Sequence, residues 1–487
     1  MGKQQPESVL KKIILQRQLP FWLLTFSVLI LLVLPSLLMD GMFMDGVQYA
    51  IISRNLAHGT GSFWEPFLSN TWDKNGCHAF LEHPPLVYGI QSLFFQILGD
   101  SRFTERFYSF LTALLTAWIL IKTWNLFFYK NDKFRKLGWL PVLFWIIIPV
   151  CSWSYQNNMQ ENTMGIFTAT SVYFTLKACI LRGKTYLSLP VAGVSVFLAT
   201  LCKGIPGLFP VVVAAIYWLV YRNFSFGRML SFTLILLVVP ALLYLLILQN
   251  PAAFKSMHFW LFERVLARMQ NEPTSGNRFD VIWRVFTELL PSIILTSLVL
   301  LISRFKKQPV LNEQIKSAWL FFGIGLAGSL PMLVSLVQKG FYLVPAFPFF
   351  ALSLSILSAN ALSSWIENMS SSGRSFRIFK LSAIFFLAAS LAFSFTRLRQ
   401  FSRDENTLVN VCEIGQLVPK GSTIEIEKEI YTDWSFQFYL LRYFDISVTA
   451  SDTGSRFYLS KSIPYSQTRG TQLILLPRDG FRLQIRN

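Results

Sequence analysis

Carboxylates, cations and amides lie in a few short segments outside the apolar runs of this sequence. The first such segment holds Asp45, Tyr49 and Arg54, about six residues after the first long apolar run ends. A helical stretch over 49–57 would bring Tyr49 and Arg54 near Asp45. A carboxylate in this position could accept a proton from an attacking hydroxyl or amine, as a general base does. Equally, Asp45 could cap the N-terminus of the helix that follows it.

The second segment combines Glu82 and His83 with two prolines, Pro84 and Pro85. Prolines at the start of a helix fix its first turn, so Glu82 and His83 are expected at the edge of the apolar run that follows. That run, 86–98, is too short to cross a bilayer, and an interfacial helix is expected there.

A third segment, 156–162, is dense in amides and ends in Glu161 and Asn162. Several amide and carboxylate partners gathered in one place could form hydrogen bonds with a sugar. The alternative is a polar loop that only contacts water.

Two Lys-Gly pairs, at Lys203 and Lys339, each stand at the end of an apolar run. Both could bind a phosphate at the level of lipid headgroups. The alternative is a lysine that extends its ammonium group to the membrane surface without a ligand. The loop 249–280 has an amphipathic pattern that predicts a helix lying on the membrane, with His258 and Arg264 on its polar side. Arg264 could bind a lipid phosphate.

Composition favours a membrane protein, because 53% of the residues are hydrophobic and only 14% are charged. A helix needs about 20 mostly apolar residues to span the bilayer. About eleven runs qualify, and the first is expected to be a retained helix rather than a cleaved signal. The predicted spans are 20–39, 104–128, 137–151, 163–180, 186–202, 206–221, 229–248, 281–303, 317–337, 341–358 and 378–395.

Basic residues gather before the first span and in alternate loops thereafter, near 130–136, 182–184, 222–228, 304–316 and 374–377. By the positive-inside rule these segments are cytoplasmic. The loops 40–103 and 249–280 and the tail 396–487 are then extracytoplasmic. The net charge of +18 is explained by this pattern, and no nucleic-acid motif accompanies it. Of the five cysteines, only Cys77 and Cys412 would have the opportunity to form a disulfide, and nothing requires one.

The fold class predicted is an all-α polytopic membrane domain over 1–395, followed by a small extracytoplasmic α/β domain over 396–487. Apolar and alternating stretches predict the strands of the tail. They fall at the alternating residues Ile424, Ile426 and Ile430, and at Ile446 to Thr449, Phe457 to Leu459 and Leu473 to Leu476.

Taken in order, these motifs resemble the GT-C fold glycosyltransferases, in particular the group of protein O-mannosyltransferases and lipid A aminoarabinose transferases. The resemblance covers about residues 20–395. It rests on the acidic residue after the first span with Tyr and Arg behind it, the acidic residue before Pro-Pro-Leu, the Lys-Gly pair, and a later basic residue followed by Tyr and two prolines. The matching residues are Asp45, Tyr49, Arg54, Glu82, Pro84, Pro85, Leu86, Lys203, Gly204, Lys339, Tyr342, Pro345 and Pro348. Gly46 departs from the family's Asp-Glu doublet, and His83 stands where Lys is frequent.

The resemblance implies an inverting glycosyltransferase that moves a sugar from a polyprenyl-phosphate carrier to an extracytoplasmic glycan, lipid or protein. Asp45 would be the base, and Lys203, Lys339 and Arg264 would stabilise the departing phosphate. Glu161 and Asn162 would position the sugar, or Glu161 would supply a second acidic group for the chemistry. Tyr49, Arg54, Glu82, His83, Asn162, His258 and Tyr342 would contact substrate. Asp45, Glu82 and Glu161 could converge on a divalent metal, but no ligand spacing indicates one. The expected location is a bacterial inner membrane with the N-terminus cytoplasmic, and the alternative function is a transporter or flippase of a lipid-linked glycan.

Overall fold

A computed structural model describes residues 7–73, 76–181, 187–267, 274–306, 309–461 and 472–486, with side chains from residue 16 onward. The predicted cytoplasmic residues 1–6, 182–186 and 307–308 lie outside this part of the chain. The fold divides into two compact units. The helical unit comprises Met1–Pro35, Phe110–Gln156 and Glu161–Thr396, and the mixed unit comprises Ser36–Ser109, Asn157–Gln160 and Arg397–Asn487.

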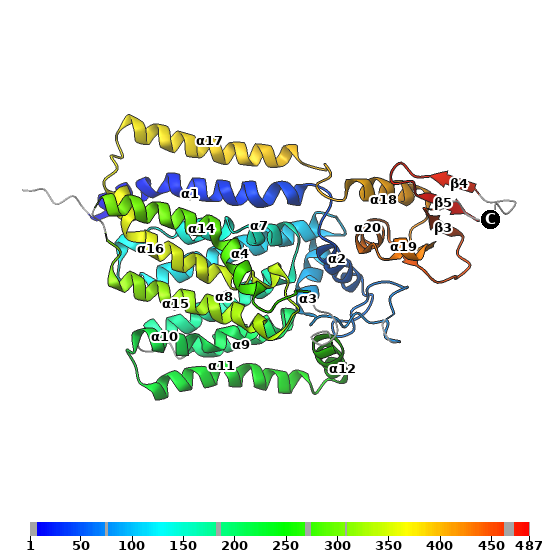
Figure 1. Cartoon of the computed structure of the whole chain (residues 1–487), viewed down its shortest axis with the longest axis horizontal. Coiled ribbons are helices and arrows are strands. Elements are labelled where there is room, and N and C mark those ends of the chain that lie inside the picture. The colour runs from blue at the N-terminus through cyan, green and yellow to red at the C-terminus, as the bar shows by residue number, and fades with distance from the viewer. Residues whose placement is uncertain are drawn as a thin grey trace, which may run out of the picture. The chain divides into compact units, whose positions relative to one another are not determined.

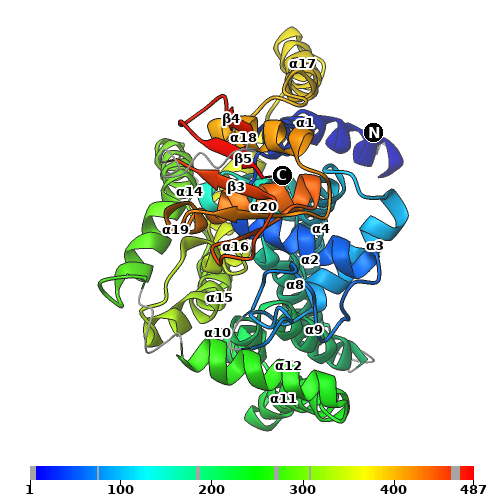
Figure 2. The same cartoon turned by 90° about the vertical axis from the view of Figure 1, so that its right-hand side faces the viewer.

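The helical unit is built from helices alone in the part that is described. They are α1 (Glu7–Leu38), α4 (Thr104–Phe127), α5 (Asp132–Arg135), α6 (Trp139–Ile146), α7 (Pro149–Gln156), α8 (Gln160–Ile180), α9 (Ser188–Lys203), η2 (Ile205–Val212), α10 (Val213–Tyr221), α11 (Phe226–Ile247), α12 (Pro251–Phe259), η3 (Trp260–Leu266), α14 (Asp280–Phe305), α15 (Asn312–Ser329), η4 (Leu330–Val334), η5 (Gly340–Leu343), α16 (Phe347–Glu367) and α17 (Arg374–Thr396). Figures 1 and 2 show the long helices packed side by side, with α17 at one edge next to α1.

Each of the predicted spans coincides with one of these helices or with a consecutive pair. Seven described helices are long and apolar enough to cross a membrane, and an eighth span results if the bent pair α6 and α7 counts as one. Exposed leucine, isoleucine and phenylalanine side chains cover α11, α14 and α17. Such helices suit a lipid environment, so the chain is a multi-pass membrane protein.

The predicted span 137–151 is broken in the middle. Helices α6 and α7 meet at an angle of 82°, and Pro149 begins the second helix because it cannot donate the backbone hydrogen bond that would continue the first. The N–H of Val150 donates to Oε2 of Glu288 on α14 at 2.8 Å. A side-chain carboxylate thereby satisfies a backbone donor that the break releases.

The mixed unit combines two helices of the long loop 40–103, called the outer loop after its predicted side, with the C-terminal tail. These helices are α2 (Met44–Ala57) and α3 (Leu86–Leu98). The tail contributes α18 (Glu405–Leu417), β1 (Thr423–Ile426), α19 (Lys428–Tyr431), α20 (Trp434–Phe444), β2 (Ser447–Thr449), β3 (Phe457–Ser460), β4 (Gln472–Leu475) and β5 (Arg482–Ile485). The five strands form one sheet in the order β2-β1-β3-β5-β4. Strand β1 runs parallel to β2 and β3, whereas β5 is antiparallel to β3 and β4. The predicted α/β tail is therefore confirmed, with β5 as a strand that the sequence did not reveal.

One apolar core joins the outer loop to the tail inside this unit. Tyr49, Ile51 and Ile52 of α2 are buried in the same cluster as Leu440 and Ile446, which belong to α20 and the residue before β2. Figure 2 shows α2 and α20 in this unit. The short helix predicted at 86–98 is α3, and its Ile97 is 81% exposed. Its interfacial position stays a prediction. All five cysteines are free, including Cys77 and Cys412.

Candidate active site

Asp45 lies in the first turn of α2 and is half-buried. The helix begins at Met44, and the carbonyl of Phe43 accepts from the N–H groups of Gly46 and Val47. Phe43 is thus the N-cap, and the alternative that Asp45 caps the helix is wrong. A carboxylate in the first turn is favoured by the partial positive charge of the helix N-terminus.

Two amides from the segment 156–162 hold this first turn in place. Oδ1 of Asn157 accepts from the N–H of Phe43 at 2.8 Å, and Nδ2 of Asn158 donates to the carbonyl of Gly46 at 3.1 Å. Gly46 is essential to this packing, because a Cβ there would lie 1.9 Å from the carbonyl oxygen of Asn157. The structure thus explains why glycine follows Asp45: no larger residue fits against Asn157.

A tyrosine from the tail binds the backbone just before Asp45. The hydroxyl of Tyr439 accepts from the N–H of Met42 at 2.9 Å and donates to the Met42 carbonyl at 2.7 Å. The same hydroxyl lies 2.9 Å from Oδ2 of Asp404. Burial and the neighbouring Asp404 carboxylate raise the pKa of Tyr439 well above its ordinary value, so its hydroxyl stays protonated and able to donate.

Tyr49, one turn after Asp45, is fully buried against the segment that carries Glu82 and His83. Its ring packs edge-on against the His83 imidazole with 5.9 Å between centroids, and it also contacts Tyr88. Glu82 and His83 are both half-buried. The structure thus brings His83 against Tyr49, on the helix that carries Asp45.

Arg54, near the C-terminal end of α2, forms hydrogen bonds and an ion pair with residues of the tail. Its Nη1 donates to the carbonyls of Leu441 and Arg442, and its Nη2 pairs with Oδ1 of Asp445 at 3.1 Å. Burial, together with the nearby Arg442 charge, lowers the pKa of Arg54. Arg54 therefore joins α2 to the C-terminal end of α20, a role that the sequence did not reveal.

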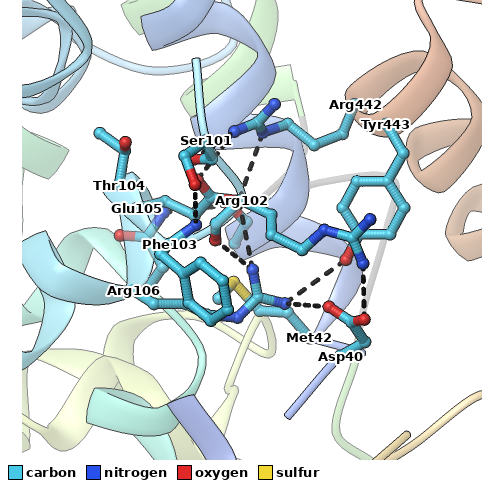
Figure 3. Close-up of polar contacts among 12 residues, drawn as sticks. Asp40, Met42, Ser101, Arg102, Phe103, Thr104, Glu105, Arg106, Arg442 and Tyr443 are labelled. Carbon is cyan, nitrogen blue, oxygen red and sulfur yellow. Dashed lines mark hydrogen bonds and ion pairs between the residues drawn. The ribbon is translucent and has the colours of Figure 1, made fainter. Parts of the chain in front are cut away.

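An ion-pair network surrounds the start of α4 in the mixed unit (Figure 3). Asp40 pairs with Arg102 at 2.5 Å and with Arg106 at 3.7 Å. Arg442 of α20 binds Glu105 at 2.9 Å and Asp100 at 2.8 Å. Burial lowers the pKa of Arg442, but the Glu105 and Asp100 carboxylates and Tyr443 together outweigh it and the net shift is upward. The sequence signal for this network was the cluster of acidic and basic residues at the start of a predicted span. It could not reveal Arg442, which lies more than 300 positions after Glu105 in the chain.

In the helical unit, Glu161 and Lys203 form a buried ion pair. Glu161 is in the first turn of α8 and Lys203 is the last residue of α9, and Nζ lies 2.6 Å from Oε1. The side chains are 0% and 8% exposed, respectively. The Lys203 ammonium also lies over the rings of Phe341 and Tyr342, 5.5 and 5.1 Å from their centroids. The structure brings together three residues predicted separately: Glu161, Lys203 and Tyr342.

The glycine of each Lys-Gly pair accommodates a large neighbour. Gly204 has a φ of +86°, and a Cβ there would lie 2.0 Å from the Trp260 ring of η3. A Cβ on Gly340 would lie 2.4 Å from Nε of Arg284 on α14. Lys339 is exposed just before η5. Arg284 is a cation beside this motif that sequence reasoning missed, although a basic residue in the first turns of a span is a recognisable signal.

The other residues predicted for the site each contact a different set of neighbours. Asn162 exchanges hydrogen bonds with Ser154 of α7, its Oδ1 accepting at 2.6 Å and its Nδ2 donating at 3.0 Å. His258 is exposed on α12 and contacts Phe254 and Phe262. Arg264 is half-buried in the π-helical turn η3. Within the described ranges, no three His, Cys, Asp or Glu residues form a group that could hold a metal ion.

Comparison with known proteins relates this fold to lipid-dependent sugar transferases. Residues 82–225 match the family model described as dolichyl-phosphate-mannose-protein mannosyltransferase. The structure of ArnT from Cupriavidus metallidurans bound to undecaprenyl phosphate superposes with a TM-score of 0.60 at 15% identity, covering 98% of each chain. The apo state of ArnT gives 0.59 at 15% identity, covering 90% of this chain and 92% of that one. An oligosaccharyltransferase from Archaeoglobus fulgidus is more distant, with a TM-score of 0.48 at 13% identity, covering 90% of this chain and 68% of that one. A search among curated proteins finds no match.

These findings confirm the class predicted from the motifs. The chain has the GT-C fold, with a helical membrane part and a small C-terminal sheet. The family match over 82–225 and the shared fold together support a membrane glycosyltransferase.

Proposed function

We propose that this protein transfers a sugar from a polyprenyl-phosphate carrier to an extracytoplasmic acceptor, with inversion at the anomeric carbon. The acceptor oxygen or nitrogen attacks that carbon as its proton passes to Asp45. The bond between the sugar and the phosphate oxygen breaks, and the phosphate leaves with the electron pair. The setting we propose is a bacterial inner membrane, with the mixed unit on the periplasmic side.

The observation that carries this proposal is the way the mixed unit fixes Asp45. Asn157, Asn158 and Tyr439 bond to the backbone at residues 42, 43 and 46, on both sides of the carboxylate. A general base is effective only when it is held within hydrogen-bond reach of the proton it removes. A solvated acidic residue of no function would not require three side chains from distant segments to fix its turn.

The helical unit contains three cations of the kind that stabilise a departing phosphate. Lys203 is a buried cation flanked by aromatic rings, and Lys339 and Arg264 are further cations of the same unit. We propose that they stabilise the negative charge that grows on the carrier phosphate in the transition state. Glu161 orients Lys203 through their ion pair, and Tyr342 contacts the carrier phosphate. The undecaprenyl phosphate bound to ArnT is consistent with such a donor.

The deciding experiment is Asp45→Asn in protein purified into lipid nanodiscs. The assay measures release of sugar from a membrane lipid extract that contains polyprenyl-phosphate sugars. We expect the rate to fall by roughly 10²–10⁴-fold, which is the usual contribution of a general base. Asp73→Asn is the matched control, because Asp73 is an exposed carboxylate on the same outer loop.

Equal rates for wild type and Asp45→Asn would refute the role of Asp45 as base. If wild type releases no sugar but moves lipid-linked glycan across the bilayer, the protein is a transporter and the proposal is wrong. Thermal unfolding of both variants shows that each is folded before the rates are compared.

A further inference from the structure

A polar pocket lies in the mixed unit, lined by the outer loop and the tail. Its volume is about 550 Å³, which is within the usual range for small-molecule sites. Its walls include five basic and three acidic residues. Tyr443, Phe103 and Phe444 add aromatic surface. The function proposed above assigns no role to this pocket.

The charges of the pocket do not cancel. Each acidic residue of the wall is paired with an arginine that also lines the pocket: Asp40 with Arg102, Asp100 with Arg442, and Asp445 with Arg54. Three of the five cations are thereby neutralised. The surplus is carried by the other two, Arg399 and Lys420.

Arg399 and Lys420 are both exposed at the pocket wall. Over the ranges that the structure describes, neither side chain has a hydrogen-bond or ion-pair partner. The backbone that carries Arg399 is nevertheless fixed, because its N–H donates to the carbonyl of Leu38 at 3.1 Å and the neighbouring Gln400 carbonyl accepts from Asp40. Two cations are therefore held at one cavity without a counter-charge.

A third cation is within reach of a ligand. Arg102 is 38% exposed although it pairs with Asp40, and its guanidinium stacks over the Tyr443 ring at 4.8 Å. Guanidinium groups bind phosphate and carboxylate through paired hydrogen bonds, and a ring attached to such a group could pack on the aromatic wall. A cavity of this volume holds far more than a free phosphate ion.

We propose that this pocket binds the phosphate group of a phosphorylated glycan or lipid headgroup, with Arg399, Lys420 and Arg102 as its ligands. This inference goes beyond the proposed transferase function and does not depend on Asp45. The short stretch of chain between the pocket and Asp45 limits the distance between them. Asp45 is five positions after Asp40 at the pocket, so their Cα atoms are at most about 18 Å apart.

The test measures hydrogen exchange of the full-length protein in phosphatidylcholine nanodiscs, in inorganic phosphate or in chloride of equal ionic strength. Phosphate should slow backbone exchange in peptides covering 97–104 and 418–424. The double variant Arg399→Gln/Lys420→Gln should raise the phosphate concentration needed for half of this protection by at least tenfold. The matched control is Lys428→Gln/Arg456→Gln, which removes two exposed cations of the same unit that do not line the pocket.

Equal loss of protection in both double variants would show nonspecific attraction by net charge and would overturn the proposal. So would the absence of any phosphate protection in wild type. Asp45→Asn should keep wild-type protection, so that this test can succeed when the proposed function fails.

Two further conditions identify the source of the phosphate. Protection that appears without added phosphate in phosphatidylglycerol nanodiscs assigns the pocket to lipid headgroups. Protection by glucose 6-phosphate in phosphatidylcholine nanodiscs, at lower concentration than by inorganic phosphate, assigns it to a phosphorylated glycan. If neither condition gives protection, the pocket does not bind phosphorylated headgroups or glycans and the proposal is wrong.

Discussion

The two units hold their buried charges in different ways. In the helical unit, Lys203 and Glu161 face each other as a pair, with aromatic rings over the ammonium. In the mixed unit, Arg442 and Arg106 share Glu105, and Arg106 shares Asp40 with Arg102. Removing one member of the buried pair takes away its closest opposite charge, whereas in the network Glu105 and Asp40 each keep a second arginine. The pair therefore suits a place where charge must change during a reaction, and the network suits a scaffold.

The largest expected effect comes from breaking the pair. Lys203→Met leaves Glu161 in a fully buried position without the ammonium at 2.6 Å. Removing one partner of a buried ion pair typically costs about 3–5 kcal/mol. We expect thermal unfolding of the purified protein to show a loss of stability of this size. The variant should also lose sugar transfer. The double variant Glu161→Gln/Lys203→Met should recover most of the stability and none of the activity.

Lys316→Met is the matched control, because it breaks an exposed pair with Glu313 that has almost the same chemistry. Exposed pairs contribute about 0–1 kcal/mol. A stability loss in Lys316→Met equal to that of Lys203→Met would contradict the distinction between buried and exposed pairs. Recovery of activity in the double variant would show that the pair is structural only.

The second prediction concerns the network, where the expected effect is smaller. Arg442→Met removes the hydrogen bonds to Glu105 and Asp100, but Arg106 stays 3.7 Å from Glu105 and Asp100 is partly exposed. Hydrogen bonds to charged groups are worth about 1.5–3 kcal/mol, so we expect a stability loss in that range rather than about 3–5 kcal/mol. Arg456→Met, an exposed position in the same unit, is the control. A loss larger than that of Lys203→Met would reverse the comparison.

The third and smallest effect is a pH dependence of the mixed unit. Burial would raise the pKa of Glu425 in β1, but hydrogen bonds from Ser455 and Thr453 and the charge of Arg486 lower it overall. A carboxylate with a lowered folded pKa stabilises the fold above its ordinary pKa of about 4.3, and this contribution is lost as the pH falls through the folded value. Acid should therefore destabilise the sheet.

Calorimetry can isolate this contribution. Loss of about 1 kcal/mol lowers Tm by roughly 2–4 °C for a unit of this size. We expect Glu425→Gln to lower Tm by about this amount at pH 6 and to match wild type at pH 3. Glu429→Gln, an exposed position in the same unit, should leave the pH profile unchanged. A constant difference between Glu425→Gln and wild type at all pH values would contradict the role of ionisation.

Much of the fold could be predicted because apolar length and alternation are local signals. The spans, the interfacial helix 86–98 and four of the five strands follow from such patterns. The break at Pro149 was not predicted, although proline is a local signal. Strand β5 was missed because Arg482–Ile485 has too few apolar residues to stand out.

The candidate site could be predicted only in part, because its contacts join distant segments. Asp45, Glu161 and Lys203 stood out by residue type and position. The roles of Asn157 and Asn158 were not predicted: the amides were expected to bind sugar, whereas these two hold the turn around Asp45. Tyr439 and Arg442 had no local signal, since their partners lie more than 300 positions earlier in the chain.

The bond between Tyr439 and Met42 also bears on how the protein is made. The two residues are separated by 397 positions, and α2 shares its core with the tail. At about 5–20 residues per second, a ribosome needs roughly 20–80 s to travel that distance. During this interval the outer loop has been synthesised but lacks the tail residues that complete its apolar core. The nascent loop would then be a natural client for a holding chaperone until synthesis is complete.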